Sequence, residues 1–173
     1  MIAPMEDNTA TLEAPQESTE QVEAPRPLAD PAKPDRGGFV WGTGRRKSAV
    51  ARVRLKPAAE EGNGKFVISG PKAKDRSVEE FFSEPQYRNA CYAPLEATDT
   101  RGKLDVFVTT SGGGTTGQAE AILLGVARAL KGYDPALEQK LRDAGYMTRD
   151  PREVERKKYG QAGARKRFQF SKR

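Results

Sequence analysis

The periodic apolar pattern that a folded core requires is confined to the middle of this sequence. From Ala49 to Lys56, apolar residues alternate with mostly basic ones, which is the period of a strand with one buried face. Between residues 115 and 132, apolar residues recur at helical spacing. We therefore predict one folded domain over residues 37–145, with an extension at each end.

Strands and helices are expected to alternate along this domain, which predicts a small α+β fold. The expected strands cover residues 39–44, 47–56, 65–69 and 104–109. The turn sequence GNGK lies between the second and third of these strands and favours a hairpin that pairs them.

Three expected helices begin at recognisable capping residues. Ser77, with Glu80 three positions later, has the pattern of a capping box. Thr115 or Thr116 is the expected cap of the long helix that follows. Asp134, followed by a proline, is expected to start a third helix that ends before Gly145.

Charge is distributed unevenly along the chain. Residues 1–36 hold eight acids, three bases and six of the twelve prolines, so we predict an acidic, Pro-rich, disordered extension. Residues 148–173 hold ten bases and three acids. An acidic amino end and a basic carboxyl end indicate a polyanion as the partner of the basic end.

Several classes of function lack the residues that they need. The chain has no His, the commonest general base and metal ligand, and Cys91 is its only cysteine. We interpret Cys91 as a small apolar core residue and expect no enzymatic activity, metal, cofactor or small-molecule substrate. The sequence has no apolar run of about 18 residues and no basic leader, so we expect a cytoplasmic protein without membrane contact.

The first candidate contact surface is a group of bases near the start of the predicted domain. Five bases and no acid occur between residues 45 and 54, whereas a solvated sheet face usually mixes charge signs. We predict phosphate contacts from these residues, which are Arg45, Arg46, Lys47, Arg52 and Arg54.

The second candidate is the glycine-rich stretch GGGTTG, at residues 112–117, ahead of the long helix. Its spacing matches a phosphate-binding loop, but Gln118 and Ala119 replace the Lys and Ser or Thr that bind nucleotide and Mg²⁺. Two interpretations stay open: an RNA phosphate bound at the helix amino terminus, or a tight turn. The residues concerned are Gly112, Gly113, Gly114, Thr115 and Thr116.

The third candidate is the basic tail, residues 146–173. Its first part, from Asp150 to Lys158, resembles a short helix that is too short to persist alone and would form mainly when docked. Beyond Gly160, Phe168 and Phe170 are interleaved with bases, which suits stacking on unpaired RNA bases. The predicted RNA contacts in the tail are Arg149, Arg152, Arg156, Lys157, Lys158, Arg165, Lys166 and Arg167.

Three stretches resemble the family of bacterial small-subunit ribosomal protein nine. They are GTGRRKSAVARVRL, SGGGTTGQAEAILLGVARAL and LRDAGYMTRDPREVERKKYGQAGARKRFQFSKR, and the resemblance covers residues 39–173. It implies a structural protein of the subunit head that contacts ribosomal RNA (rRNA) and neighbouring head proteins. It also implies a two-layer fold like the second domain of ribosomal protein five, with a left-handed β-α-β crossover.

In that family, the tail passes through rRNA toward the tRNA in the peptidyl site. The resemblance therefore implies that Lys172 and Arg173 contact that tRNA. Two alternatives stay open, and the first of them rests on analogy with similar small α+β folds alone. One is an RNA-processing enzyme subunit that holds Mg²⁺ through Asp99 and Asp105, and the other is a free nucleic-acid-binding protein.

Overall fold

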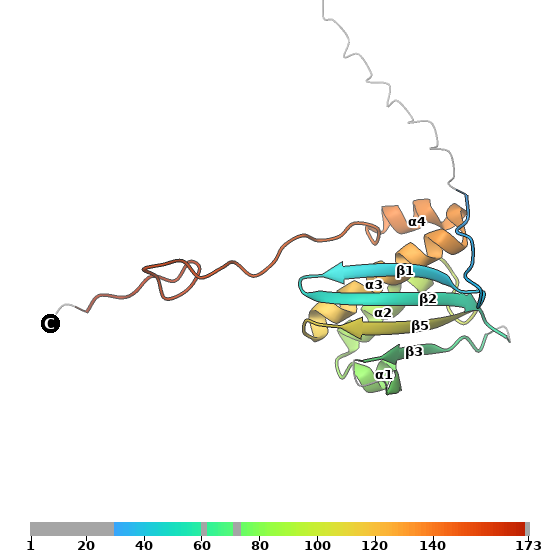
Figure 1. Ribbon diagram of the computed structural model, residues 1–173, viewed down its shortest axis with the longest axis horizontal. Helices are drawn as coiled ribbons and strands as arrows, with labels where there is room; N and C mark the ends of the chain where they lie inside the picture. Colours follow the sequence, from blue (N-terminus) through green and yellow to red (C-terminus); the bar gives the residue numbers. More distant parts are fainter. Residues whose placement is uncertain (1–29, 60–61, 71–73, 172–173) are drawn as a thin grey trace, which may run out of the picture.

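The computed structural model describes residues 30–59, 62–70 and 74–171, which form one α+β domain followed by a long tail (Figure 1). A five-stranded sheet has the strand order β1-β2-β5-β3-β4. Helices α2 and α3 lie together on one face of the sheet, so the expected mixed fold is confirmed in two layers. The elements are β1 (Val40–Arg46), β2 (Ala49–Pro57), β3 (Phe66–Ser69), β4 (Asp75–Ser77), α1 (Val78–Phe81), α2 (Pro85–Ala97), β5 (Leu104–Ser111), α3 (Thr115–Tyr133), the 3-10 helix η1 (Pro135–Leu137) and α4 (Glu138–Asp143).

The alternation read from the sequence gives β2 its two faces. Ala49, Ala51, Val53 and Leu55 are fully buried against the helices. The residues between them point to the opposite face, which no helix of the described chain covers. The sheet therefore has one core face and one open face.

The predicted hairpin between the second and third strands is wrong. Strand β5 lies between β2 and β3, antiparallel to β2 and parallel to β3. A turn sequence allows a reversal of the chain but does not choose a partner. Strand β5 is buried along most of its length, as a central strand must be, whereas β3 is mostly half-buried.

The parallel pairing of β3 with β5 requires a crossover connection. This connection contains β4, α1 and α2, and the sequence interpretation anticipated only α1. Helix α2 escaped notice because Pro94 lies inside it and its apolar residues form no clear stripe. The left hand of the crossover stays a prediction from the family resemblance.

Two of the three predicted helix caps are confirmed. The Ser77 hydroxyl accepts a hydrogen bond from the Glu80 N–H at 3.2 Å, and the Asp134 carboxylate accepts one from the Ala136 N–H at 2.9 Å. The predicted cap at Thr115 or Thr116 is wrong, because the N-cap of α3 is Gly114 and Thr115 is already helical.

Strand β1 and helix α3 approach each other at backbone distance. A Cβ atom added to Gly44 would lie 1.9 Å from the Ala121 carbonyl oxygen, and one added to Gly42 would lie 2.3 Å from the Gly125 carbonyl oxygen. Real Cβ atoms do not come so close to backbone atoms, so glycine is required at both positions. The contact fixes the amino-terminal strand on the longest helix.

On the amino-terminal side, the chain contacts the domain before residue 37, the expected start of the fold. The Ala32 N–H donates to the Gly132 carbonyl oxygen at 2.8 Å. The predicted disordered extension covers residues 1–36, and its residues 1–29 lie outside the described residues. None of the helices in the described part of the chain is long and apolar enough to cross a membrane.

The tail leaves the domain after α4 and extends far from it (Figure 1). Residues 146–171 contain no helix or strand, so the short helix predicted from Asp150 to Lys158 is not formed in this structure. In such a helix Glu153 would face Lys157 one turn later, whereas here the Glu153 carboxylate lies 3.5 Å from the Arg149 guanidinium. Asp150 and Arg152 contact the domain through Arg46, but so short a segment does not offset the cost of helix nucleation by itself.

Candidate nucleic-acid interface

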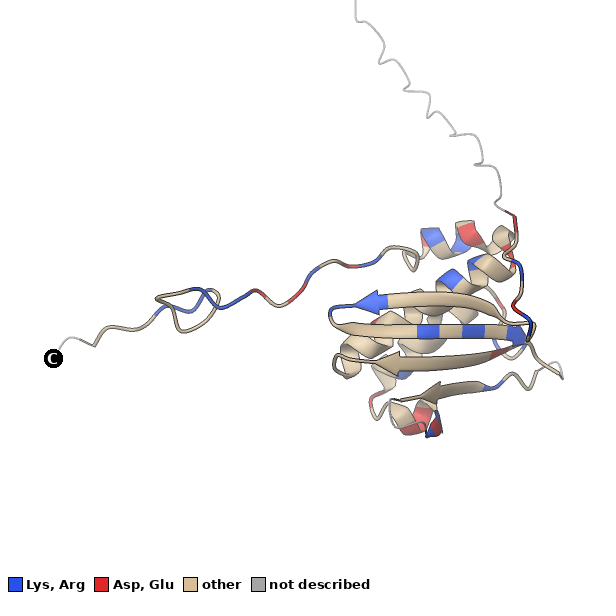
Figure 2. Cartoon of the chain, viewed as in Figure 1, with Lys and Arg blue, Asp and Glu red and all other residues tan. Residues whose placement is uncertain are grey.

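The open face of the sheet carries a row of bases along β2. Arg52, Arg54 and Lys56 alternate with buried residues, so all three point away from the helices. Figure 2 shows the basic positions in blue along the β2 ribbon. Arg45 lies on the same face of β1. Among the described residues, Arg45, Arg52 and Arg54 form no ion pair, so their charges are free for a ligand.

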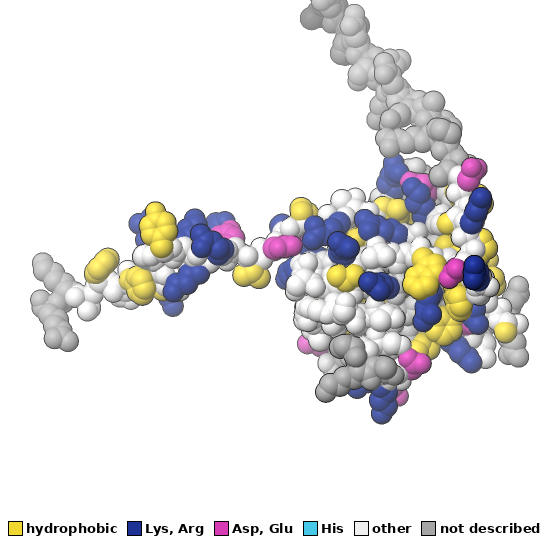
Figure 3. All heavy atoms as spheres, viewed as in Figure 1, with side chains coloured by type: hydrophobic (Ala, Val, Ile, Leu, Met, Phe, Trp, Pro, Cys, Tyr) yellow, Lys and Arg dark blue, Asp and Glu magenta, His cyan; other side chains and the backbone are white. Residues whose placement is uncertain are grey.

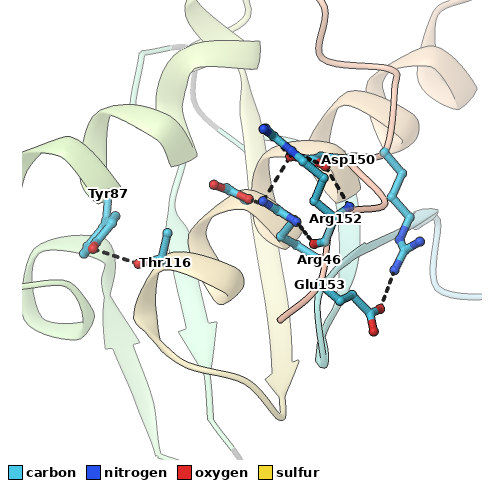
Figure 4. Close-up of polar contacts among 8 residues, drawn as sticks. Arg46, Tyr87, Thr116, Asp150, Arg152 and Glu153 are labelled. Atoms are coloured by element: carbon cyan, nitrogen blue, oxygen red, sulfur yellow. Dashed lines mark hydrogen bonds and ion pairs between the residues drawn. The ribbon is translucent and has the colours of Figure 1, made fainter. Parts of the chain in front are cut away.

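Arg46 does not belong to this surface. The alternation along β1 turns it toward α3, where its side chain is only 11% exposed. Its guanidinium pairs with Glu120 of α3 and, at 3.0 Å between Nη2 and Oδ2, with Asp150 of the tail (Figure 4). It also donates a hydrogen bond to the Arg152 carbonyl oxygen.

We call Arg46, Glu120, Asp150 and the Arg152 carbonyl the tail latch. The predicted basic group at the β1–β2 turn is therefore divided between two tasks. Lys47 at the tip is exposed and forms no ion pair with any described residue, whereas Arg46 holds the root of the tail on the domain. Sequence spacing could have shown this division, because adjacent residues of a strand face opposite ways.

Asp150 is held in its ionised form. Its carboxylate accepts hydrogen bonds from the side chain and the backbone N–H of Arg152, both at 2.9 Å. These bonds, followed by the charges of Arg152 and Arg46, lower the pKa of Asp150 to about 2. Because this pKa is so low, Asp150 carries its negative charge at every physiological pH.

The glycine loop before α3 is explained by its packing. Gly112 and Gly113 have positive φ angles of 71° and 67°. A Cβ atom on Gly112 would lie 2.5 Å from the Ser48 carbonyl oxygen, and one on Gly113 would lie 2.7 Å from the Ala49 Cβ. The turn therefore requires both glycines without any ligand, and phosphate binding at this loop stays a prediction.

The two threonines after the loop have different surroundings. The Thr116 hydroxyl lies 2.8 Å from the Tyr87 hydroxyl, which links the start of α3 to α2 (Figure 4). Thr115 is the first residue of α3 and is exposed. Of the two, Thr115 has the hydroxyl that is more readily available to a ligand.

The tail's basic residues from Arg149 to Arg167 are all exposed. Three of them pair with acids of the tail itself: Arg149 with Glu153, Arg152 with Asp150, and Arg165 with Glu155. Five others form no ion pair with any described residue, namely Arg156, Lys157, Lys158, Lys166 and Arg167.

The outer tail also presents aromatic rings. Phe168 is 58% exposed and Phe170 is 95% exposed. Each lies close in sequence to Lys or Arg residues that have no ion pair with any described residue. Figure 3 shows hydrophobic and basic side chains side by side along the tail. Lys172 and Arg173 lie outside the described residues.

Sequence reasoning missed a group of aromatic residues on the open face of the sheet. Phe39 directly precedes β1, Trp41 lies in β1, and Phe107 lies in β5. Trp41 is the most exposed large apolar residue of the domain, at 51%. The strand alternation that placed the bases on this face could also have placed the rings there.

Asp105 and Cys91 have structural roles in this fold. The Asp105 carboxylate is nearly buried and accepts a hydrogen bond from the Lys65 N–H at 2.9 Å. Burial raises the pKa of the Cys91 thiol to about 12, which fits the expected core role. No group of three or more His, Cys, Asp or Glu residues with metal-binding geometry occurs within the described ranges, so Asp99 and Asp105 belong to no such group.

The fold and these surfaces define a small α+β protein whose bases and exposed rings suit a polyanionic partner. The family model described as Ribosomal protein S9/S16 matches residues 44–173, and the chain belongs to this family. Family membership confirms the resemblance read from the three sequence stretches.

The chain matches two curated relatives over almost the whole length of each relative. Small ribosomal subunit protein uS9 of Solidesulfovibrio magneticus is 52% identical over 135 residues, which are 78% of this chain and 97% of the relative. The protein of the same name from Anaeromyxobacter sp. (strain K) is 53% identical over 130 residues, which are 75% of this chain and 93% of the relative.

Proposed function

We propose that this chain is a structural protein of the small ribosomal subunit that binds its rRNA and serves translation in the bacterial cytoplasm. The curated relatives carry the name of a small-subunit protein, and the family match extends through the basic tail to residue 173. In the subunit head, the chain contacts rRNA and neighbouring proteins and carries out no catalysis.

The observation that carries this proposal is the exposed charge of the tail. Arg156, Lys157, Lys158, Lys166 and Arg167 have no acidic partner among the described residues, and the tail stands away from the domain. Such a segment contributes little to the stability of a free protein. Beside rRNA phosphates, each base releases a counterion and becomes favourable.

The reach of the tail supports a second contact at its tip. Thirteen residues follow Gly160, and an extended chain of that length spans roughly 40 Å. Lys172 and Arg173 would then lie beyond the rRNA contacts of the domain, beside the tRNA in the peptidyl site. This part of the proposal depends on the resemblance to the family.

The rRNA contact is tested by the salt dependence of binding. The variant Lys166→Ala/Arg167→Ala should lower the slope of log K against log salt by roughly 0.7–0.9 for each phosphate that the tail no longer neutralises. The matched control is Lys103→Ala/Lys140→Ala, which removes the same charge from exposed positions elsewhere on the domain. Equal slopes for the two variants would indicate unspecific adhesion and contradict the proposal.

The tRNA contact is tested in reconstituted small subunits. A chain that lacks Lys172 and Arg173 should assemble normally but hold peptidyl-site tRNA less tightly. Affinity is measured by filter binding against subunits with the full chain. Unchanged tRNA affinity in fully assembled subunits would remove this role and leave the rRNA proposal standing.

A further inference from the structure

The open face of the sheet presents one large, accessible aromatic surface. The Trp41 side chain is half exposed, and Phe39 and Phe107 meet edge to face beside it, with ring centroids 5.9 Å apart. Figure 3 shows hydrophobic side chains lying among Lys and Arg side chains over this part of the sheet. Exposed rings on a flat sheet are not explained by packing of the core.

Cations hold these rings in place. The Arg54 guanidinium lies 5.6 Å from the centroids of both Phe39 and Trp41. The Lys56 ammonium lies 5.6 Å from the Phe107 centroid and 5.8 Å from that of Phe39. These cation–π contacts order the side chains before any ligand arrives.

The charge of the face selects the chemistry of its partner. Across β1, β2 and β5, the open face carries the bases Arg45, Arg52, Arg54 and Lys56 and one carboxylate, Asp105. Asp105 already accepts a hydrogen bond from the Lys65 N–H and lies 3.6 Å from Lys56. The core of a protein–protein interface is depleted of charge, whereas this surface suits phosphates.

An RNA strand with unpaired nucleobases is bound by two features together, an aromatic ring and nearby cations. Bases locked in a duplex hide their faces by stacking on one another, whereas an unpaired base can stack on an aromatic side chain while nearby cations contact its phosphates. Trp41 offers the ring, and Arg52 and Arg54 offer the cations on the neighbouring strand, opposite Thr43 and Trp41.

We propose that this face binds a single-stranded segment of RNA and that an unpaired base stacks on Trp41. The inference rests on the proposed function and adds a class of RNA structure and a contact residue to it. A double-helical segment would meet the same cations but would leave the indole unused.

The test uses the full chain, because Trp41 is its only tryptophan and its fluorescence reports this face alone. The probes are a single-stranded 12-nucleotide RNA of mixed sequence and a fully paired hairpin with the same number of phosphates. We expect the single strand to quench Trp41 fluorescence and the hairpin to leave it nearly unchanged. Trp41→Ala should weaken binding of the single strand by about 5- to 100-fold.

Two further variants separate stacking from folding and from general aromatic exposure. Trp41→Phe keeps a ring and should retain most of the affinity. Tyr133→Ala removes an exposed ring outside this face and should change nothing. Single-strand binding without quenching, and with equal affinity in Trp41→Ala, would overturn the inference while the proposed rRNA binding stands. Loss of all RNA binding by the unaltered chain would overturn both.

A photo-crosslinker at position 41 in reconstituted small subunits identifies the neighbour directly. Crosslinks from Trp41→p-benzoylphenylalanine to an unpaired rRNA nucleotide support the inference. Crosslinks to a ribosomal protein, or to a nucleotide within a continuous duplex, overturn it.

Discussion

At the scale of single residues, neighbours in sequence have separate tasks. Arg45 and Arg46 differ in function because β1 turns one toward solvent and the other toward α3. The exposed residue keeps its charge for a ligand, and the buried one uses its charge on Glu120 and Asp150. A basic motif read as one unit in sequence therefore contains a structural residue.

Removing the Arg46 side chain should loosen the root of the tail. In Arg46→Ala, Asp150 loses a partner and the Arg152 carbonyl loses a donor, so the segment separates from α3 more often. Trypsin cleavage after Arg149 should then be faster by on the order of tenfold. Arg45→Ala is the control, since that side chain is exposed and unpaired within the described residues; equal cleavage rates in both variants would argue against the latch.

The carboxyl group of Asp150 should titrate well below an ordinary aspartate. Its pKa of about 2 lies under the unfolded value of about 3.9. Ionised Asp150 therefore stabilises the folded state above roughly pH 4, and this contribution disappears as the pH falls toward 2. An NMR titration should show the pKa rising more in Arg152→Ala than in Arg46→Ala, since Arg152 is the main cause of the shift; the reverse order would contradict it.

At the scale of elements, close packing of β1 on α3 is the least replaceable feature of the fold. Gly42 and Gly44 allow the strand to touch the helix backbone, and Gly125 receives it. The neighbouring β2 brings its apolar face to the same helix. These contacts also set which way Trp41 and Arg45 point.

Gly44→Ala should destabilise the protein strongly. The added methyl group would lie 1.9 Å from the Ala121 carbonyl oxygen, and neither backbone can move without breaking the sheet or the helix. Overpacking of this kind costs about 3 kcal/mol or more of unfolding free energy, measured by urea denaturation. Gly70→Ala is the control, because its nearest neighbour, a Phe81 ring atom, lies at an ordinary 3.7 Å. A similar, small loss in both variants would refute the packing argument.

At the scale of the whole molecule, the domain and the tail are held in shape by different interactions. The domain has a buried core between the sheet and the helices. The tail beyond Glu153 has its hydrogen bonds and ion pairs within itself, such as Arg165 with Glu155. The latch is the link between these two parts.

Truncations should separate the latch from the rest of the tail. A chain that ends at Lys157 keeps Asp150 and Arg152 and should unfold at the same temperature as the full chain. A chain that ends at Thr148 leaves Arg46 with Glu120 alone and should lose about 3–6 °C in Tm, measured by circular dichroism. If both truncations have the same Tm, the latch contributes nothing to the domain.

Much of the fold was predictable wherever the signal is local. The buried face of β2, the caps Ser77 and Asp134 and the long helix α3 all follow from spacing along the chain. The pairing of β3 did not, because its partner β5 lies far away in sequence. Helix α2 was missed because it contains Pro94 and lacks a clear apolar stripe, and the cap at Gly114 because the threonines that follow it are the usual capping residues. At the site, the bases were predictable, but the aromatic rings beside them were overlooked.

By itself, the sequence determined which parts of this chain can bury a core and which must stay in solvent, because periodic apolar residues and excess charge act locally. It also determined that the tail carries more basic residues than its acidic residues can pair. Only the tertiary structure decided that β5 separates β2 from β3, that Arg46 faces inward to hold the tail, and that Trp41, Arg54 and Phe107 share one surface. Alternation within one strand assigns a residue to one face or the other, but strand order and register decide what lies beside it on that face, and these arise from contacts between distant segments.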